Sequence, residues 1–396
     1  MTSLTIAGGV YHERCTWPEW NHTYGSGGRA AAAVAGHLDD VKLYSYACPL
    51  AAEKFKPYAE MYGFDFQEVA GKQLISFDYV HSLSNPVIRP IIGRIQQNDL
   101  IPVAADAVLR FGMLEGSALV EARRCVYDPQ SAFDPETFEE NGSRADELAI
   151  VANRAEIAGM TGASDPLDGA NILIERGAQL VVVKSGAEGA YVVSSSGSER
   201  VPAFQSERVW TIGSGDVFAA VFAARWAALD DAPLEAARMA SRAVAAYAES
   251  MSLPVPKWTD LASAERAETI SIPGQVYLAS PFFTLGERWV VEEARRGLKE
   301  LGLEVFSPLH EIGPGVAEVV APADIAGIDA SDRVFAILDG VDSGTLFEVG
   351  YAVAKGIPVY ALAQNVSEED LKMVQGSGCR VYGDFVTALH HAAWRL

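Results

Sequence analysis

The segment DSGTLFEVGYAVAKGIPV begins with Asp342 and carries a second carboxylate, Glu348, six residues later. Glu348 follows within a run that is expected to be helical, between the apolar residues Phe347 and Val349. A glutamate on an apolar helix face costs stability unless it is exposed, paired or used in chemistry. Two such acids suit cleavage of a bond at an anomeric carbon. An ionised carboxylate stabilises or traps the oxocarbenium-like sugar, and a second carboxyl group protonates the leaving group.

The elements around these acids place them at one edge of a sheet. The strand VYLAS leads into Pro281, and the strand RVFAILDG leads into Asp339 and Asp342. In open α/β sheets the loops at the carboxyl ends of the strands form the ligand crevice. We therefore expect these groups and Glu348 to share one rim. Aspartate in a turn and glutamate near a helix N-terminus are also common structural features, so the pattern alone leaves a capping role open.

Residues 275–396 resemble the nucleoside 2-deoxyribosyltransferase family. The resemblance is carried by YLASPFF, PADIAGID and the block DGVDSGTLFEVGYAVAKGIPV. It implies that Glu348 is the nucleophile, that Asp342 and Asp324 hold and protonate the base, and that Tyr277 hydrogen-bonds the nucleophile. A helix cap is the alternative role for Asp324.

The same resemblance implies substrate contacts from Phe282, Phe283 and Gly344, and no cofactor for this domain. Ser343 stands where some members carry a further acid. The loop PFFTLGER offers Arg288 as its basic residue, whereas relatives that cleave nucleotides carry a Gly- and Arg-rich loop there. This difference favours nucleosides over nucleotides.

A second chemical motif, VWTIGSGDVFAAVFAARW, places Gly213, Gly215 and Asp216 where a loop opens onto a helix. Backbone amides at such a junction bind anionic oxygens, because glycine allows close approach and the helix dipole favours negative charge. An aspartate beside them is able to deprotonate a hydroxyl group.

Residues 1–250 resemble the ribokinase-like (PfkB) family of sugar and nucleoside kinases, through GGRAAAAVAGHL, VYDPQ, NRAE, VVVKSGAEGAYV and GSGD in that order. The resemblance implies ATP and Mg²⁺ as cofactors and Asp216 as the catalytic base. It implies nucleotide contacts from Gly213, Ser214, Gly215, Lys184, Gly186 and Gly189, substrate contacts from Glu13, Gly27 and Gly28, and a magnesium site organised by Asn153 and Glu156.

Two departures from that family leave an alternative open. The chain has Trp210-Thr211-Ile212 where the family usually has Asp-Thr-Thr, and the helix from Gly27 lacks the asparagine that often contacts the sugar. The kinase-like domain is then either an active kinase or a degenerate scaffold that senses a nucleotide or pairs subunits.

The pattern of elements predicts an α/β protein of two domains. Short apolar strands alternate with Ala-rich helices up to about residue 250, and a new α/β series starts near residue 275. We predict a ribokinase-like α/β sandwich with a mostly parallel sheet over 1–255, a linker over 256–274, and a smaller flavodoxin- or Rossmann-like parallel-sheet domain over 275–396. The pair His390-His391 is expected on a solvated helix surface.

Composition excludes several classes of protein. A formal net charge of −21 disfavours general attraction to nucleic acid, and no apolar run reaches the ~18 residues that cross a bilayer. The four scattered cysteines form no metal-binding or disulfide pattern. We expect a cytoplasmic enzyme that acts on a small nucleoside or sugar, without nucleic acid or membrane partners. Both resemblances imply a homo-oligomer.

These expectations combine into a bifunctional enzyme of nucleoside or sugar metabolism. The C-terminal domain cleaves or transfers at an N-glycosidic bond, and the N-terminal domain phosphorylates a sugar or nucleoside hydroxyl.

Overall fold

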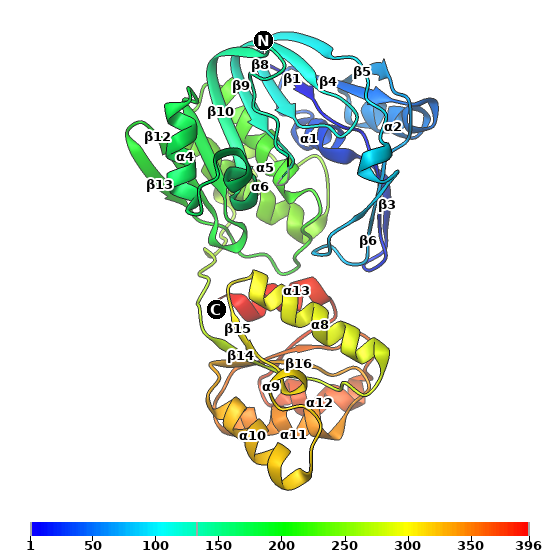
Figure 1. Cartoon of the computed structure of the whole chain (residues 1–396), viewed down its shortest axis with the longest axis vertical. Helices are drawn as coiled ribbons and strands as arrows, with labels where there is room; N and C mark the ends of the chain where they lie inside the picture. Colours follow the sequence, from blue (N-terminus) through cyan, green and yellow to red (C-terminus); the bar gives the residue numbers. More distant parts are fainter. Residues whose placement is uncertain (1, 132–133, 395–396) are drawn as a thin grey trace. The chain divides into compact units, whose positions relative to one another are not determined.

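The computed structural model describes residues 2–131 and 134–394, and the chain divides into two compact units (Figure 1). The first comprises Met1–Ser206 and Trp210–Glu268, and the second comprises Glu207–Val209 and Thr269–Leu396. The second unit therefore includes three residues from the middle of the chain, and residues 256–268 of the expected linker belong to the first unit.

The first unit is organised around a sheet whose strand order, over the described residues, is β13-β12-β11-β10-β9-β8-β1-β4-β5. These strands are β1 (Ser3–Ala7), β4 (Asp40–Ala47), β5 (Asp65–Ala70), β8 (Ile101–Phe111), β9 (Ala118–Asp128), β10 (Arg144–Asn153), β11 (Leu180–Lys184), β12 (Ala190–Ser194) and β13 (Gly197–Val201). Pairing is parallel from β11 to β5, and β12 and β13 add an antiparallel hairpin. Central strands such as LVVVK of β11 are apolar without alternation because helices cover both faces.

Helices form a layer on each face of this sheet. The first face packs on α1, α2, α5, η3 and α6, and the second face packs on α3 and α4. The helices of the unit are α1 (Gly25–Val34), α2 (Pro49–Tyr62), α3 (Arg154–Thr161), α4 (Pro166–Glu175), α5 (Ser214–Ala223), α6 (Pro233–Ser250) and α7 (Trp258–Ser263), with the short 3₁₀ helices η1 (Ile92–Arg94) and η2 (Gly186–Glu188) and the π-helical segment η3 (Ala224–Ala228).

A second, smaller sheet in the first unit has the order β3-β2-β6-β7. Its strands are β2 (His12–Cys15), β3 (Trp20–Thr23), β6 (Ser76–Tyr79) and β7 (Val87–Arg89). Because β2 follows β1 directly and α1 follows β3, this sheet is connected to the carboxyl end of β1. It brings Glu13 toward the larger sheet.

The parallel strands β8 and β9 are joined by residues 112–117, which contain no helix. Parallel neighbours usually need a crossover of about a dozen residues or more. Figure 1 shows β8, β9 and β10 as long, arched strands. The buried Arg110 lies in this region, where it donates 2.8 Å hydrogen bonds to Phe138 O and Ser117 Oγ and pairs with Glu136.

The second unit has a fully parallel sheet in the order β15-β14-β16-β17-β18 over the described residues. One face packs on α10, α11 and α12, and α8 and α13 lie together on the opposite side of the sheet (Figure 1). Its elements are β14 (Gln275–Ala279), α8 (Leu285–Glu300), β15 (Glu304–Phe306), α9 (Pro308–Glu311), α10 (Ala317–Asp329), β16 (Arg333–Ile337), α11 (Ser343–Ala354), β17 (Val359–Leu362), α12 (Glu368–Gly376), β18 (Arg380–Tyr382) and α13 (Phe385–Ala393). This order is the one seen in flavodoxin-like folds, whose ligands bind outside the carboxyl ends of the strands.

The predicted fold class is confirmed. The chain is α/β with a large mostly parallel sheet and a separate all-parallel C-terminal domain. Among the described residues, no helix is both long and apolar enough to cross a membrane. The four cysteines are buried, as expected of small apolar residues.

The prediction of a solvated His390-His391 pair was wrong. Both side chains are buried on α13, where His391 stacks on Tyr382 at 4.7 Å and its Nε2 lies 3.3 Å from Glu207 O. His390 Nδ1 lies 2.8 Å from Val386 O, and burial lowers its pKa to about 4. Two adjacent histidines near the C-terminal end were expected to be exposed to solvent, but neighbouring residues bury both side chains.

Candidate active sites

In the second unit the structure brings together Tyr277 and Glu348, two residues for which the family resemblance implies a hydrogen bond. The Tyr277 hydroxyl donates a 2.6 Å hydrogen bond to Glu348 Oε1. Tyr277 is fully buried in β14, and its ring stacks on Phe306 at 5.6 Å, which fixes the direction of the hydroxyl. Glu348 lies on α11 between the exposed Phe347 and the buried Val349, so its carboxylate lies at the edge of the core.

The environment of Glu348 raises the pKa of its carboxyl group to about 7. Burial is the main cause, since it penalises the charged form. The hydrogen bond from Tyr277 opposes this rise, whereas the charges of Asp324 and Asp342 add to it. Glu348 is therefore shared between its ionised and protonated forms near neutral pH. A carboxyl group with a strongly perturbed pKa beside other acids is a feature of catalytic sites.

Asp324, on α10, contributes to the same cluster. Its charge and hydrogen bonding raise the pKa of Tyr277, and burial raises its own pKa. Its Oδ1 is buried and has no hydrogen-bond partner within the described part of the chain. A buried carboxyl oxygen without a hydrogen-bond partner costs stability, and such groups are found at catalytic and ligand-binding sites.

Asp342 caps α11, as the alternative interpretation of the sequence allowed. Its Oδ2 accepts 2.8 Å and 3.1 Å hydrogen bonds from the backbone N–H and the hydroxyl of Thr345. Its charge also acts on Glu348, so the cap and the acid cluster coincide. Gly344 lies in the first turn, and a Cβ added there would be 3.0 Å from Asp342 Oδ2.

The predicted substrate contacts Phe282 and Phe283 follow β14. Their rings lie 5.3 Å apart; Phe282 is half-buried, and Phe283 is 71% exposed. Arg288 donates a 2.9 Å hydrogen bond to Phe282 O, so this cation is engaged with the loop itself.

In the first unit, the GSGD motif forms the start of α5. Gly213 is the N-cap residue with φ 77°, a left-handed conformation that favours glycine, and Asp216 is buried in the first turn. Burial raises the pKa of Asp216 to about 6; Arg29 lowers it, while Glu13 and Asp128 raise it. Asp216 is thus mainly ionised at neutral pH despite its burial.

Arg29, which was not predicted as a site residue, lies at the centre of this cluster. It is 1% exposed and donates to Asp216 Oδ2 at 2.8 Å, to Glu13 Oε1 at 3.1 Å and to the Tyr247 hydroxyl at 3.1 Å. A Cβ at Gly213 would lie 2.1 Å from Arg29 Nε, so packing as well as φ requires glycine there. The available sequence signal was a single cation within the run GGRAAAAV.

Lys184 lies at the carboxyl end of β11, where its Nζ donates a 2.6 Å hydrogen bond to Asp128 Oδ2 at the end of β9. Asp128, also unpredicted, is fully buried. A Cβ at Gly215 would lie 3.6 Å from Lys184 Nζ, an ordinary contact distance. Space therefore remains beside an ammonium group and a helix N-terminus, an arrangement that suits a phosphoryl oxygen.

The other predicted glycines have structural reasons to be glycine. A Cβ at Gly27 would lie 2.6 Å from Gly8 C, and one at Gly28 would lie 2.6 Å from the Phe55 ring, so α1 packs closely on the segment after β1. Gly186 has φ 55° and Gly189 has φ 94° in the turn between β11 and β12. Their predicted ligand contacts stay predictions.

Asn153 and Glu156 form a reciprocal cap at the start of α3. Glu156 N donates to Asn153 Oδ1 at 2.9 Å, and Asn153 N donates to Glu156 Oε2 at 2.7 Å. Within residues 2–131 and 134–394 no three acidic, His or Cys side chains are grouped to hold a metal ion directly. Mg²⁺ commonly binds through one or two carboxylates together with phosphates and water.

The charges of this region nevertheless fit a divalent cation. The clustered carboxylates outnumber the clustered cations, as the mutual effects on their pKa values show. The carboxylates are Glu13, Asp128, Glu156 and Asp216, and the cations are Arg29 and Lys184. A bound Mg²⁺ would offset part of this excess of negative charge.

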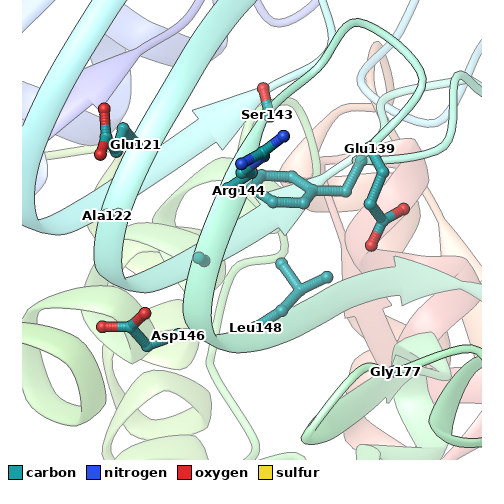
Figure 2. A pocket seen from close by; sticks show the side chains of 10 residues that line it. Glu121, Ala122, Glu139, Ser143, Arg144, Asp146, Leu148 and Gly177 are labelled. Atoms are coloured by element: carbon teal, nitrogen blue, oxygen red, sulfur yellow. The ribbon is translucent and has the colours of Figure 1, made fainter.

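A cavity of about 430 Å³ lies elsewhere in the first unit, at the N-terminal ends of β9 and β10 (Figure 2). Its lining includes Glu121, Arg144, Asp146 and Leu148, and none of the predicted site residues. It lies at the strand ends opposite those that carry Asp128 and Asn153, so it is separate from the candidate kinase site.

Comparison with known proteins identifies the families of both units. The family model of nucleoside 2-deoxyribosyltransferase matches residues 276–380, and that of the pfkB family carbohydrate kinases matches residues 143–256. A search of curated proteins finds no match.

Solved kinase structures resemble the first unit. Ribokinase from Giardia lamblia matches with 16% identity and a TM-score of 0.50, over 66% of this chain and 98% of that one. Ribokinase from Thermotoga maritima matches with 16% identity and a TM-score of 0.49, over 66% and 99%. Fructokinase from Vibrio cholerae, solved with fructose, ADP and calcium ion, matches with 14% identity and a TM-score of 0.49, over 66% and 98%.

At this level of identity the Giardia lamblia structure shows a shared fold. The predicted ribokinase-like fold of the first unit is thereby confirmed, and both predicted family resemblances are confirmed by the family models. The chain carries a pfkB-family carbohydrate kinase domain followed by a nucleoside 2-deoxyribosyltransferase domain.

Proposed function

We propose that the C-terminal domain transfers or hydrolyses at the N-glycosidic bond of a nucleoside, with Glu348 as the nucleophile. The observation that carries this proposal is the 2.6 Å hydrogen bond from Tyr277 to Glu348 within a cluster that includes Asp324 and Asp342. One carboxylate is oriented by a buried phenol, and further acids lie within electrostatic range.

In the proposed first step, a Glu348 oxygen forms a bond to the anomeric carbon while the bond from that carbon to the base nitrogen breaks. Asp342 or Asp324 gives a proton to the departing base, which leaves as the neutral free base. In the second step an acceptor base or water attacks the anomeric carbon, its proton returns to the aspartate that was deprotonated in the first step, and Glu348 is released as a carboxylate. Tyr277 stabilises the charge on Glu348 whenever the carboxylate is free.

Incubation of the whole protein with deoxynucleosides, with and without a second free base, tests this proposal. Chromatography should show release of the first base, and a new nucleoside if transfer occurs. Glu348→Gln should abolish both products, whereas Glu300→Gln, a change at an exposed position on α8, should leave them unchanged. Base release that survives Glu348→Gln would contradict the assignment.

We propose that the N-terminal domain is an ATP-dependent kinase for a sugar or nucleoside hydroxyl, with Asp216 as the base. The acceptor oxygen forms a bond to the γ-phosphorus of ATP, its proton passes to Asp216, and ADP leaves. The Gly213–Gly215 loop and Lys184 would hold the phosphates, and Asn153 and Glu156 would organise Mg²⁺, which supplies charge neutralisation when bound. Support comes from the buried Asp216 at the start of α5 and from the space beside Gly215.

Formation of ADP in the presence of candidate sugars and nucleosides tests the kinase proposal. Asp216→Asn should abolish acceptor-dependent ADP formation while nucleotide binding remains. Ribose, deoxyribose and intact nucleosides should be compared, because a kinase could act on the released sugar or on the nucleoside before cleavage.

One observation favours a second candidate for this domain, a nucleotide-sensing or subunit-pairing module without kinase activity. Trp210 is 3% exposed, stands where the family usually has aspartate, and lies 5.3 Å from Trp20 of β3. ATP that alters base release by the C-terminal domain without any ADP formation would support this candidate and contradict the kinase proposal.

A further inference from the structure

The guanidinium group of Arg29 is almost fully used inside the first unit. Its Nε donates to the Tyr247 hydroxyl, its Nη1 donates to both Glu13 and Asp216, and its Nη2 donates to Glu13. These contacts occupy four of the five N–H donors that an arginine has. Arg29 therefore joins the smaller sheet, through Glu13, to the start of α5 and to α6.

The two oxygens of Asp216 are in different situations. Oδ2 accepts the 2.8 Å hydrogen bond from Arg29 Nη1, whereas Oδ1 has a long contact of 3.4 Å from Gln130 Nε2. A carboxylate that acts as a base needs one oxygen that is fixed and one that is open to the proton. Oδ1 is the oxygen of Asp216 that meets the second condition.

We infer that Arg29 is a positioning residue for phosphotransfer: it holds Asp216 charged and turned so that Oδ1 faces the acceptor hydroxyl, while Glu13 fixes the guanidinium. This inference rests on the proposed kinase function. Arg29 has little donor capacity left for a ligand, so it acts through Asp216. Glu13 binds Arg29, and the substrate contact that the family resemblance implies for it stays a prediction.

The surroundings of Asp216 explain why a cation is needed there. Negative charge predominates around the buried carboxyl group, and Arg29 is the main influence that lowers its pKa. The charged and titratable groups that face it are Glu13 and Tyr79 of the smaller sheet, Arg29 of α1, Asp128 of β9, Glu156 of α3 and Lys184 of β11. Without Arg29 the pKa of Asp216 rises above about 6, and a larger fraction of the base is protonated at neutral pH.

The pH profile of acceptor-dependent ADP formation tests this inference. The wild type should lose activity as the pH falls through about 6. Arg29→Gln should move this loss of activity to a pH at least about one unit higher. At pH values below the shifted pKa the rate of the variant should then be about tenfold lower than that of the wild type, and near pH 9 the variant should regain much of the wild-type rate. Arg29→Lys, which keeps the charge, should lie between the two.

Arg124→Gln is a matched control, because Arg124 is also a largely buried arginine of this unit, paired with Glu147 at 2.9 Å. It should leave the acid limb in place. A loss in Arg29→Gln that is equal at every pH would overturn the inference, and so would a gain in activity, which would mean that Arg29 obstructs the acceptor site.

A double-mutant cycle provides a readout that does not need catalysis. Urea unfolding at pH 8 should show that Arg29→Gln lowers the folding equilibrium constant at least about tenfold more when Asp216 is present than in the Asp216→Asn background. If the effects of Arg29→Gln and Asp216→Asn on stability were additive, Arg29 would not stabilise the charge of Asp216, and the inference would be overturned. An inactive wild type would instead contradict the proposed phosphotransfer, and with it a catalytic use of the pair, whatever the cycle shows.

Discussion

The hydroxyl of Tyr277 lies 2.6 Å from Glu348 Oε1, which joins the first strand of the C-terminal domain to α11. This hydrogen bond lowers the pKa of Glu348 against the opposing effect of burial. Tyr277→Phe should therefore raise that pKa above about 7 and move the acid limb of base release to higher pH. Loss of one hydrogen bond to a charged group, worth ~1.5–3 kcal/mol, corresponds to a fall in rate of about 10- to 100-fold at pH 7. A pH–rate profile of the variant checks this, and an unchanged limb would exclude the role given to Tyr277.

The wild-type C-terminal domain should show its own pH dependence. Glu348 acts in its ionised form, and its pKa is about 7, so base release should rise between pH 6 and pH 8. Asp324, whose pKa is raised by burial, would give its proton to the departing base, so the rate should fall again at higher pH as Asp324 ionises. Steady-state rates measured across pH 5–9 at saturating nucleoside check the bell shape. A rate that is constant from pH 5 to pH 7 would contradict ionisation of Glu348 in this range.

Two substitutions of Asp342 should separate its capping role from its chemical role. Asparagine is as good an N-cap as aspartate, because its side-chain oxygen would still accept from Thr345 N, so Asp342→Asn should change the free energy of unfolding by less than about 0.5 kcal/mol. Asp342→Ala removes the cap and should cost about 1 kcal/mol. If Asp342 protonates the base, both variants should lose about 10²- to 10⁴-fold in base release. Urea unfolding and base-release assays on the same preparations compare the two effects, and full activity in Asp342→Asn would leave the proton transfer to Asp324.

The two glycines of the GSGD motif should respond differently to alanine. Gly213→Ala combines a left-handed φ of 77° with a Cβ 2.1 Å from Arg29, and should destabilise the first unit by about 1–3 kcal/mol. Gly215→Ala meets Lys184 Nζ at 3.6 Å and should leave stability within about 0.5 kcal/mol, while weakening nucleotide binding by filling the space beside Lys184. Thermal unfolding and ATP titration check the pair. Equal stability of the two variants would contradict the packing described for Arg29.

Arg110→Met should be strongly destabilising, although Arg110 lies outside both candidate sites. Its guanidinium is fully buried over the Tyr127 ring at 4.8 Å and is paired with Glu136. Removal of the guanidinium leaves Phe138 O, Ser117 Oγ and Glu136 without this partner, and should lower the free energy of unfolding by about 3 kcal/mol. Arg123→Met, at a half-exposed arginine with a 3.9 Å ion pair, is the matched control and should cost less than about 1 kcal/mol. Urea unfolding measures both, and similar values would mean that the Arg110 cluster contributes little.

The sequence predicted the regular part of the fold because that part depends on local patterns. The apolar runs LVVVK and RVFAI form β11 and β16, and the Ala-rich segment after Ala232 forms α6. The strands of the smaller sheet were not predicted, since HERC and WNHT are short and polar. HERC pairs with WNHT on one side and with β6, far along the chain, on the other. The short connection between β8 and β9 also has no local signal, because it contains no helix of its own.

The candidate sites divide in the same way. The pairing of Tyr277 with Glu348 was implied by the family resemblance, and the parallel strand order accounts for it, because the ends of β14 and β16 lie side by side, next to the start of α11. Arg29 could not be predicted to bind Asp216, since these residues are 187 positions apart and the contact depends on how α1 packs against α5. The glycines at 27 and 213 allow that approach, but their sequence context indicated ligand binding rather than packing.

The placement of Glu207–Val209 in the second unit has a consequence for anyone who divides this protein. Val209 N donates a 3.0 Å hydrogen bond to Thr387 Oγ1, and Trp210, the next residue, returns to the first unit with its N–H bonded to Ala248 O. Therefore no single division of the gene gives two complete units. A fragment that starts after Glu268 lacks residues Glu207–Val209, to which Thr387 binds. A fragment that ends at Glu268 keeps these residues but lacks Thr387. Separate expression of the halves would compare two damaged proteins, so each activity is better assigned by point substitutions in the intact chain.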